Sequence, residues 1–89
     1  MINVALLGFG RIGQMHAQNI YLNKTLNLLY VYEKIDKLRK KAKNLYNCII
    51  EKDYKKIFSD EKVDIIFISS PTNTHIRFIE EGIKYNKTI

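Results

Sequence analysis

The apolar residues of this chain fall into short runs, separated by stretches in which apolar residues recur every three or four positions. The first run, residues 2–7, is apolar at nearly every position, as in a central parallel strand that is covered on both faces. Runs rich in Leu, Val, Ile and Tyr predict further strands at residues 27–32, 48–50 and 63–69. Residues 87–89 have the pattern of another strand that has only begun.

Helical spacing occupies the intervals between these strands. We expect a helix over residues 11–22, a second helix that Asp36 caps, a brief helical turn at 54–58, and a last helix that Asn73 or Thr74 caps and that stops near Asn86. The apolar residues at helical spacing are Ile12, Met15, Ile20, Leu38, Ala42, Leu45, Ile76, Ile79 and Ile83. Alternating strands and helices predict an α/β fold, a Rossmann-type doubly wound parallel sheet of about four strands plus the start of a fifth.

Composition narrows the class of protein. The 89 residues suffice for one small domain, and no segment approaches the roughly 20 apolar residues of a membrane span, so a soluble, cytoplasmic protein is expected. Cys48 is the single cysteine, so an internal disulfide is excluded, and we expect its side chain to lie in the core. The net charge of +6 is concentrated on residues 34–43, where a solvated helix face explains it better than specific nucleic-acid binding.

The residues directly after the first strand form the motif Gly8-Phe9-Gly10-Arg11-Ile12-Gly13. Gly8 permits a tight turn, Gly10 lets the backbone approach a phosphate, and Gly13 lets the next helix pack closely on the sheet. The start of that helix offers unpaired N–H groups and the positive end of its dipole. The motif therefore predicts binding of a dinucleotide pyrophosphate, with a purely structural glycine turn as the alternative.

An acidic residue, Glu33, follows the second strand, 20 residues beyond Gly13. A carboxylate at this place accepts hydrogen bonds from a ribose and repels a 2′-phosphate, so NAD is predicted and NADP is less favoured. Lys34 argues the other way, because an ammonium group could pair with that phosphate.

A third candidate segment, residues 69–75, follows the strand at 63–69. Since the carboxyl ends of parallel strands meet at one edge, the glycine motif, Glu33 and this segment should converge on one crevice at the switch point between the first and fourth strands. Within the segment, a neutral His75 is predicted to donate or accept a hydrogen bond, with an exposed polar residue as the alternative. His16 is expected to be a structural histidine, and Arg11 either contacts a phosphate or is solvated.

These motifs resemble the cofactor domain of the glucose-fructose oxidoreductase and inositol dehydrogenase family. The resemblance rests on the glycine motif continued by His16-Ala17, on Glu33 and on Ser70-Pro71-Thr72-Asn73-Thr74-His75, and it covers essentially the whole chain. It implies an NAD(P)-dependent oxidoreductase that moves hydride between nicotinamide and the hydroxyl-bearing carbon of a sugar or of a cyclic polyol such as inositol. The residues that it assigns to the cofactor are Gly8, Phe9, Gly10, Arg11, Ile12, Gly13, Glu33, Ser69, Ser70, Pro71, Asn73 and His75.

The resemblance also implies a continuation, since family members proceed into a Glu-Lys-Pro motif and a substrate domain with catalytic Lys, Asp and His. We therefore expect residues 1–89 to form an incomplete NAD(P)-binding domain that holds neither catalytic nor metal-binding residues. A sugar or polyol substrate, and homo-oligomer contacts, would require the substrate domain. A stand-alone nucleotide-binding or scaffold module without enzyme activity is the main alternative, and a methyltransferase is a weaker one.

Overall fold

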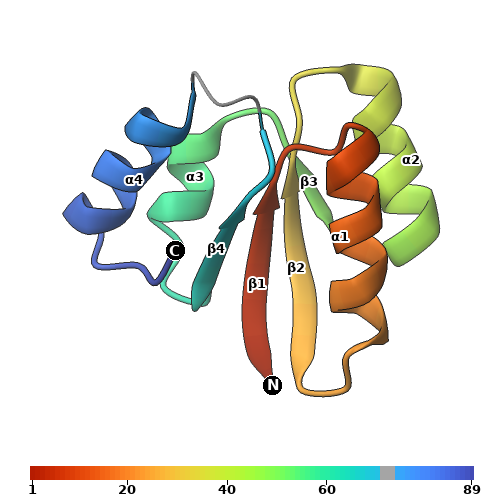
Figure 1. The fold of residues 1–89 in the computed structure, drawn as a ribbon, viewed down its shortest axis with the longest axis horizontal. Helices are drawn as coiled ribbons and strands as arrows, with labels where there is room; N and C mark the ends of the chain where they lie inside the picture. The colour runs from red at the N-terminus through yellow and green to blue at the C-terminus, as the bar shows by residue number, and fades with distance from the viewer. Residues whose placement is uncertain (71–73) are drawn as a thin grey trace.

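Strands and helices alternate along the chain, and the strands form one parallel sheet in the order β3-β2-β1-β4 (Figure 1). The computed structural model describes residues 1–70 and 74–89. The elements are β1 (Ile2–Leu7), α1 (Arg11–Leu22), β2 (Leu26–Tyr32), α2 (Asp36–Tyr46), β3 (Ile49–Glu51), α3 (Tyr54–Phe58), β4 (Ile65–Ile68) and α4 (His75–Lys84). The predicted Rossmann-type α/β class is confirmed.

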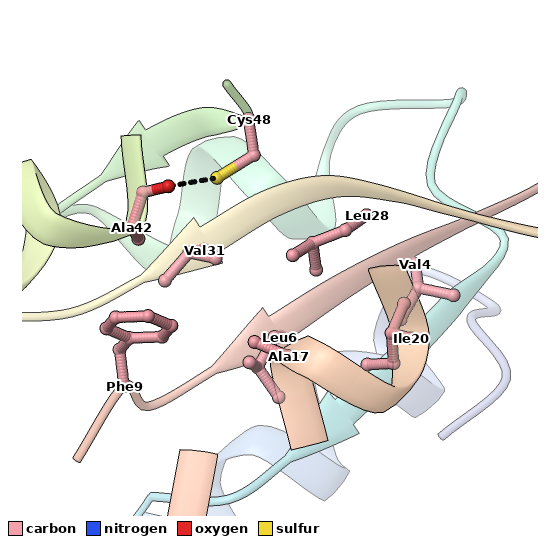
Figure 2. Close-up of a cluster of buried hydrophobic side chains, with 9 residues drawn as sticks. All are labelled: Val4, Leu6, Phe9, Ala17, Ile20, Leu28, Val31, Ala42 and Cys48. Carbon is pink, nitrogen blue, oxygen red and sulfur yellow. Dashed lines mark hydrogen bonds between the residues drawn. The ribbon is translucent and has the colours of Figure 1, made fainter. Parts of the chain in front are cut away.

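Helices cover both faces of the sheet, α1 and α2 on one side and α3 and α4 on the other (Figure 1). Because β1 lies between two layers, its residues Val4–Leu7 are buried on both faces. One core cluster lies under α1 and α2 (Figure 2), and it contains Val4, Leu6, Phe9, Ala17, Ile20, Leu28, Val31, Ala42 and Cys48. The other lies under α3 and α4, and it contains Ala5, Leu7, Tyr30, Tyr32, Ile57, Phe58, Val63, Ile66 and Phe78.

The carboxyl ends of the strands lie together at one edge of the sheet (Figure 1). Backbone pairing continues just past the strands: the Gly8 N–H donates to the Tyr32 carbonyl at 2.8 Å and the Ser69 N–H donates to the Leu7 carbonyl at 2.8 Å. At the outer side of β4, Thr88 forms a single parallel bridge with Ile65. The start of a fifth strand is thus present as one bridge, as the residues 87–89 predict.

Several expected details are wrong. Ile35, and not Asp36, is the N-cap of α2, while β4 is shorter than the run at 63–69 and β3 lies one residue later than expected. The apolar spacing is right for Ala42, which α2 buries, but it is wrong for Leu45, which is 54% exposed. It is also wrong for Ile83, which is 75% exposed, because α4 buries Phe78 against the sheet instead.

Over the described ranges, no helix combines the length and the hydropathy that crossing a membrane requires.

Candidate functional site

The glycine motif forms a tight junction between β1 and α1. Gly8 has a φ of +106°, a left-handed conformation that favours glycine, and a Cβ there would lie 2.8 Å from the Ser70 nitrogen. A Cβ on Gly13 would collide with the Gly8 carbonyl oxygen. These two positions therefore bring α1 against the end of β1 and bring the end of β4 against the turn.

The middle glycine faces open space. Gly10 is the N-cap of α1, and a Cβ built on it would meet no atom within 4 Å. No side chain from the described part of the chain caps this helix, so the N–H groups of its first turn are left for a ligand or water. Unpaired N–H groups at the positive end of a helix dipole bind anions.

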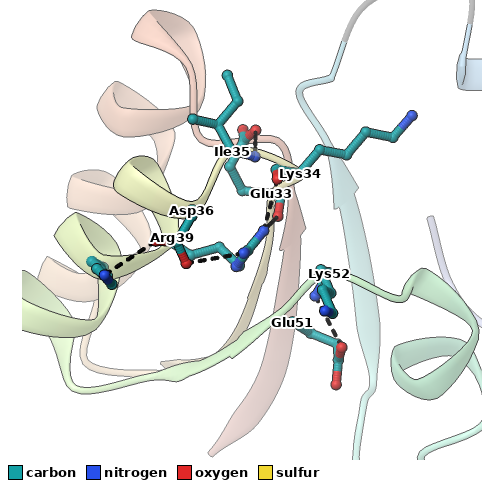
Figure 3. A network of polar contacts seen from close by, with 8 residues as sticks. Glu33, Lys34, Ile35, Asp36, Arg39, Glu51 and Lys52 are labelled. Atoms are coloured by element: carbon teal, nitrogen blue, oxygen red, sulfur yellow. Dashed lines mark hydrogen bonds and ion pairs between the residues drawn. The ribbon is translucent and has the colours of Figure 1, made fainter.

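Glu33 holds the glycine loop from the neighbouring strand. Its Oε1 accepts the Phe9 N–H at 2.8 Å and its Oε2 accepts the Ile35 N–H at 3.0 Å. Arg39 fixes the same turn, because its guanidinium donates to the Glu33 carbonyl at 2.7 Å and to the Lys34 carbonyl at 2.8 Å (Figure 3). The carboxylate thus lies at the junction of the two loops that follow β1 and β2.

A cleft of about 560 Å³ opens beside Glu33 at the carboxyl edge of the sheet. Its lining residues are Gly8, Tyr32, Glu33, Lys34, Ile35, Lys52, Asp53, Tyr54, Ser70, Thr74, Arg77 and Phe78. Three of these residues form an aromatic cluster, since the rings of Tyr32, Tyr54 and Phe78 meet edge to face at centroid distances of 5.3 to 6.1 Å. The cleft therefore combines apolar aromatic surface with charged side chains.

The phenol of Tyr32, which belongs to the aromatic cluster of the cleft, stays neutral. Burial raises the pKa of Tyr32, and the neighbouring Glu33 carboxylate acts in the same direction. A neutral phenol beside a carboxylate leaves Glu33 as the anionic group on this side of the cleft.

The end of β4 is tied to the glycine turn by side chains. Ser69 Oγ donates to the Gly8 carbonyl at 2.9 Å, and Ser70 Oγ lies 2.7 Å from Thr74 Oγ1. His75 Nε2 lies 2.7 Å from the Ser70 carbonyl oxygen, and because a carbonyl only accepts, Nε2 carries the proton and donates. Pro71 and Asn73, which the family resemblance also assigns to the cofactor, lie outside the described residues.

The structure brings some of the predicted site residues together and separates others. Gly8, Glu33 and Ser70 line the cleft. The Phe9 side chain is fully buried in the core, and Arg11 lines a different groove, between α1 and α2. His16 packs on the ring of Phe67 at a centroid distance of 4.7 Å, as expected for a structural histidine.

Other predicted positions point away from the cleft or hydrogen-bond to the backbone around it. Ile12 is 55% exposed on α1, while Ser69 and His75 contact backbone carbonyls rather than the cleft. Sequence reasoning missed the lining residues Lys52, Asp53 and Arg77. Lys52 and Asp53 directly follow β3, so the rule that strand ends share one edge could have found them. Among the residues that the structure describes, no group of three or more His, Cys, Asp or Glu side chains could hold a metal ion.

A parallel αβα sheet with a glycine turn, an open helix start and an acid after the second strand defines a dinucleotide-binding Rossmann domain. Residues 2–89 match the family described as "Oxidoreductase family, NAD-binding Rossmann fold" (GFO_IDH_MocA), and the chain belongs to this family.

Relatives of known name share this domain. The chain is 30% identical over 93 residues to a myo-inositol 2-dehydrogenase of Thermotoga maritima. The aligned region covers 99% of this chain and 27% of that protein. The crystal structure of a myo-inositol dehydrogenase from Corynebacterium glutamicum is similar at 28% identity with a TM-score of 0.90, over 98% of this chain and 26% of that one. A scyllo-inositol dehydrogenase from Lactobacillus casei, solved with NAD(H) and scyllo-inositol, is similar at 25% identity with a TM-score of 0.91. The similarity covers 98% of this chain and 26% of that one. The chain thus spans about a quarter of the length of these relatives.

Proposed function

We propose that this domain binds NAD with the pyrophosphate on the start of α1 and the adenosine in the cleft beside Glu33. The observation that carries the proposal is the open space at Gly10, which lies next to unpaired N–H groups of the first turn of α1. A phosphate oxygen can approach this backbone without meeting a side chain.

The cleft suits the adenosine half of the cofactor. An adenine ring would lie against the aromatic surface that includes Tyr54, and the ribose hydroxyls would donate to the Glu33 carboxylate. Each Glu33 oxygen accepts one backbone N–H, and a carboxylate oxygen has a second lone pair for a hydroxyl. Glu33 favours NAD because a negative charge at this place disfavours a 2′-phosphate.

We further propose that the domain serves an oxidoreductase that acts on a CH–OH group of a sugar or of a cyclic polyol such as inositol. The named relatives include inositol dehydrogenases, and this chain corresponds to about a quarter of their length. The residues that move the proton, bind the polyol and form any homo-oligomer contacts would belong to a substrate domain. Residues 1–89 supply cofactor binding to that reaction.

The test is the Gly10→Val substitution, followed by calorimetric titration with NAD. Valine fills the space at Gly10 that the phosphate would enter, so we expect at least a tenfold loss of NAD affinity, which is about 1.4 kcal/mol. Gly10 has φ −74° and ψ −165°, an extended conformation that valine also adopts, so the fold should remain intact.

Asn19→Val is the matched control, because it places the same side chain on an exposed position of α1. Circular dichroism checks that both variants are folded. Unchanged NAD affinity in folded Gly10→Val protein would reject the proposed position of the pyrophosphate.

A further inference from the structure

Arg39 differs from the neighbouring cation of α2 in its burial. Its side chain is 13% exposed, whereas that of Lys40 is 71% exposed. Instead of extending into solvent, the guanidinium returns past the start of α2 to the turn that carries Glu33 (Figure 3). We propose that Arg39 is a positioning residue for the cofactor, which holds the Glu33 carboxylate where the adenosine ribose would meet it, so that NAD affinity depends on Arg39. This inference rests on the proposed function.

The guanidinium closes the turn between β2 and α2 by binding its backbone. Nη1 donates to the Glu33 carbonyl at 2.7 Å and to the Lys34 carbonyl at 2.8 Å, and Nη2 donates to Asp36 Oδ1 at 3.1 Å. Because Nη1 carries two hydrogens, it can hold both carbonyls at once, and the planar fork of a guanidinium fixes their directions. One side chain therefore holds this turn at three points.

The place of Arg39 in α2 does not favour the helix itself. Arg39 is the fourth residue of α2, close to the positive end of the helix dipole, where a cation is disfavoured. Its ion pair with Asp36 offsets this only in part, because Asp36 is 66% exposed and an exposed pair contributes little. The two carbonyls of the turn thus explain the guanidinium better than helix stability does.

The turn determines where the Glu33 carboxylate points. Its Oε1 accepts the Phe9 N–H of the glycine loop at 2.8 Å, and its Oε2 accepts the Ile35 N–H of the turn itself at 3.0 Å. On the other side, the Glu33 N–H donates to the Glu51 carbonyl at 3.1 Å. Arg39 supplies the remaining contact, at the Glu33 carbonyl. The carboxylate is therefore aligned before a ligand arrives, and less has to be ordered on binding.

Loss of the guanidinium should loosen this alignment. The carbonyls of Glu33 and Lys34 would turn to water, and the carboxylate would hold its aligned position for only part of the time. The apparent affinity for NAD then falls by the fraction of molecules that are aligned. Since the effect acts through Glu33, it requires the Glu33 carboxylate to be present.

The experiment begins with calorimetric titration of wild type, Arg39→Met and Lys40→Met with NAD. Methionine keeps an unbranched apolar side chain at position 39 and removes the donors, so we expect Arg39→Met to bind NAD about fivefold more weakly. Lys40→Met is the matched control, because it removes the other cation that pairs with Asp36 from an exposed position. It should change NAD affinity by less than about twofold.

The second step separates positioning from a general effect on the fold. Glu33→Ala should itself weaken NAD about tenfold, and Arg39→Met added to it should weaken NAD by less than about twofold more, because no carboxylate is left to align. Circular dichroism checks that each variant is folded.

Three results would overturn the inference and leave the NAD site in place: wild-type affinity in Arg39→Met, equal losses from Arg39→Met with and without Glu33, and an Arg39→Met protein that does not fold. Wild-type affinity in Glu33→Ala would overturn both the inference and the proposed ribose contact. Failure of the folded wild-type protein to bind NAD would overturn the proposed function, and the inference with it.

Discussion

At the scale of single residues, Gly13 and Gly10 belong to one motif but differ in whether they have room for a side chain. A Cβ at Gly13 would collide with the Gly8 carbonyl oxygen and would lie 3.0 Å from Ser69 Oγ, whereas a Cβ at Gly10 would meet nothing. The first position therefore serves the packing of α1 on β1, and the second leaves room for a ligand.

Gly13→Ala should consequently unfold more easily than wild type. Because backbone must move to admit the methyl group, we expect the free energy of unfolding to fall by about 1–3 kcal/mol. Gly10→Ala is the matched control and should cost less, about 0.5 kcal/mol, because no atom obstructs its methyl group and alanine is only a poorer N-cap residue than glycine. Urea denaturation followed by circular dichroism measures both, and equal stability of the two variants would contradict the close contact.

Glu33 shows how far a residue can be interpreted from sequence. Its place after the second strand predicts a ribose ligand, and the structure does place it in the cleft. The hydrogen bond that the Phe9 N–H donates to the Glu33 carboxylate could not be predicted, because it depends on the path of a loop 24 residues earlier. The burial of Phe9 itself was missed for the same reason.

At the scale of elements, β2 is joined to the turn before β4 by one short hydrogen bond. The Tyr30 hydroxyl donates to Asp60 Oδ2 at 2.6 Å, and Lys87 Nζ donates to the Asp60 carbonyl. The hydrogen bond to Asp60, together with burial, raises the pKa of Tyr30 to about 12 from its ordinary 10.0. The same hydrogen bond holds the pKa of Asp60 below its ordinary 3.8.

These shifts predict how stability depends on pH. Because the folded pKa of Tyr30 is raised, its contribution is present below pH 10 and is lost as the pH rises toward 12. Because the folded pKa of Asp60 is lowered, its contribution is present above pH 3.8 and is lost at more acidic pH. Tyr30→Phe should therefore cost about 1 kcal/mol at pH 7, and this difference should shrink at alkaline pH.

Urea denaturation of wild type and Tyr30→Phe at neutral pH and near the raised pKa checks this expectation. Tyr21→Phe is the control, since Tyr21 is exposed and its ring contact with Tyr46 does not use the hydroxyl. A Tyr30→Phe difference that is as large at alkaline as at neutral pH would show that the hydroxyl does not act through Asp60.

Apolar spacing predicts which elements exist better than which of their faces is buried. The order of strands and helices agrees with the structure, because each run is long enough to have a clear period. In α4, however, Ile76 and Ile83 are exposed while Phe78 and Gly82 are buried. A helix with apolar residues on more than one face does not itself indicate which face packs inward.

At the scale of the whole molecule, β1 is the strand on which the fold depends. It pairs with β2 on one side and with β4 on the other, and both core clusters contain its residues. Among the described residues, β3 pairs with β2 alone, over three residue pairs, and Thr88 forms a single bridge. Stability should therefore decrease from the middle of the sheet to its edges.

Amide hydrogen exchange tests this ordering. The amides of β1 should exchange most slowly, because their release requires separation from two strands and two helix layers. Those of β3 and Thr88 should exchange fastest among the residues paired in the sheet. Slower exchange in β3 than in β1 would mean that the edge near α2 is held more firmly than its pairing indicates.

The parallel sheet also explains why the position of the site was predictable and its charge was not. The glycine motif, Glu33 and Ser70 meet because the strands end at one edge, which follows from topology alone. The sequence predicts where α4 begins, with Thr74 as a candidate cap, but it does not predict that the Arg77 side chain lines the cleft together with Lys52. These positive side chains of the cleft are identified only in the three-dimensional structure.

Cys48 has a practical consequence for work with this protein. Its thiol is 4% exposed, lies 3.8 Å from the Ala42 carbonyl (Figure 2) and has a pKa that burial raises. A reagent that modifies thiols needs an accessible thiolate. In the folded domain the Cys48 thiol is buried and protonated, so it should not react. Since this is the single cysteine of the 89 residues, any label that becomes attached marks a molecule in which the region under α2 has opened.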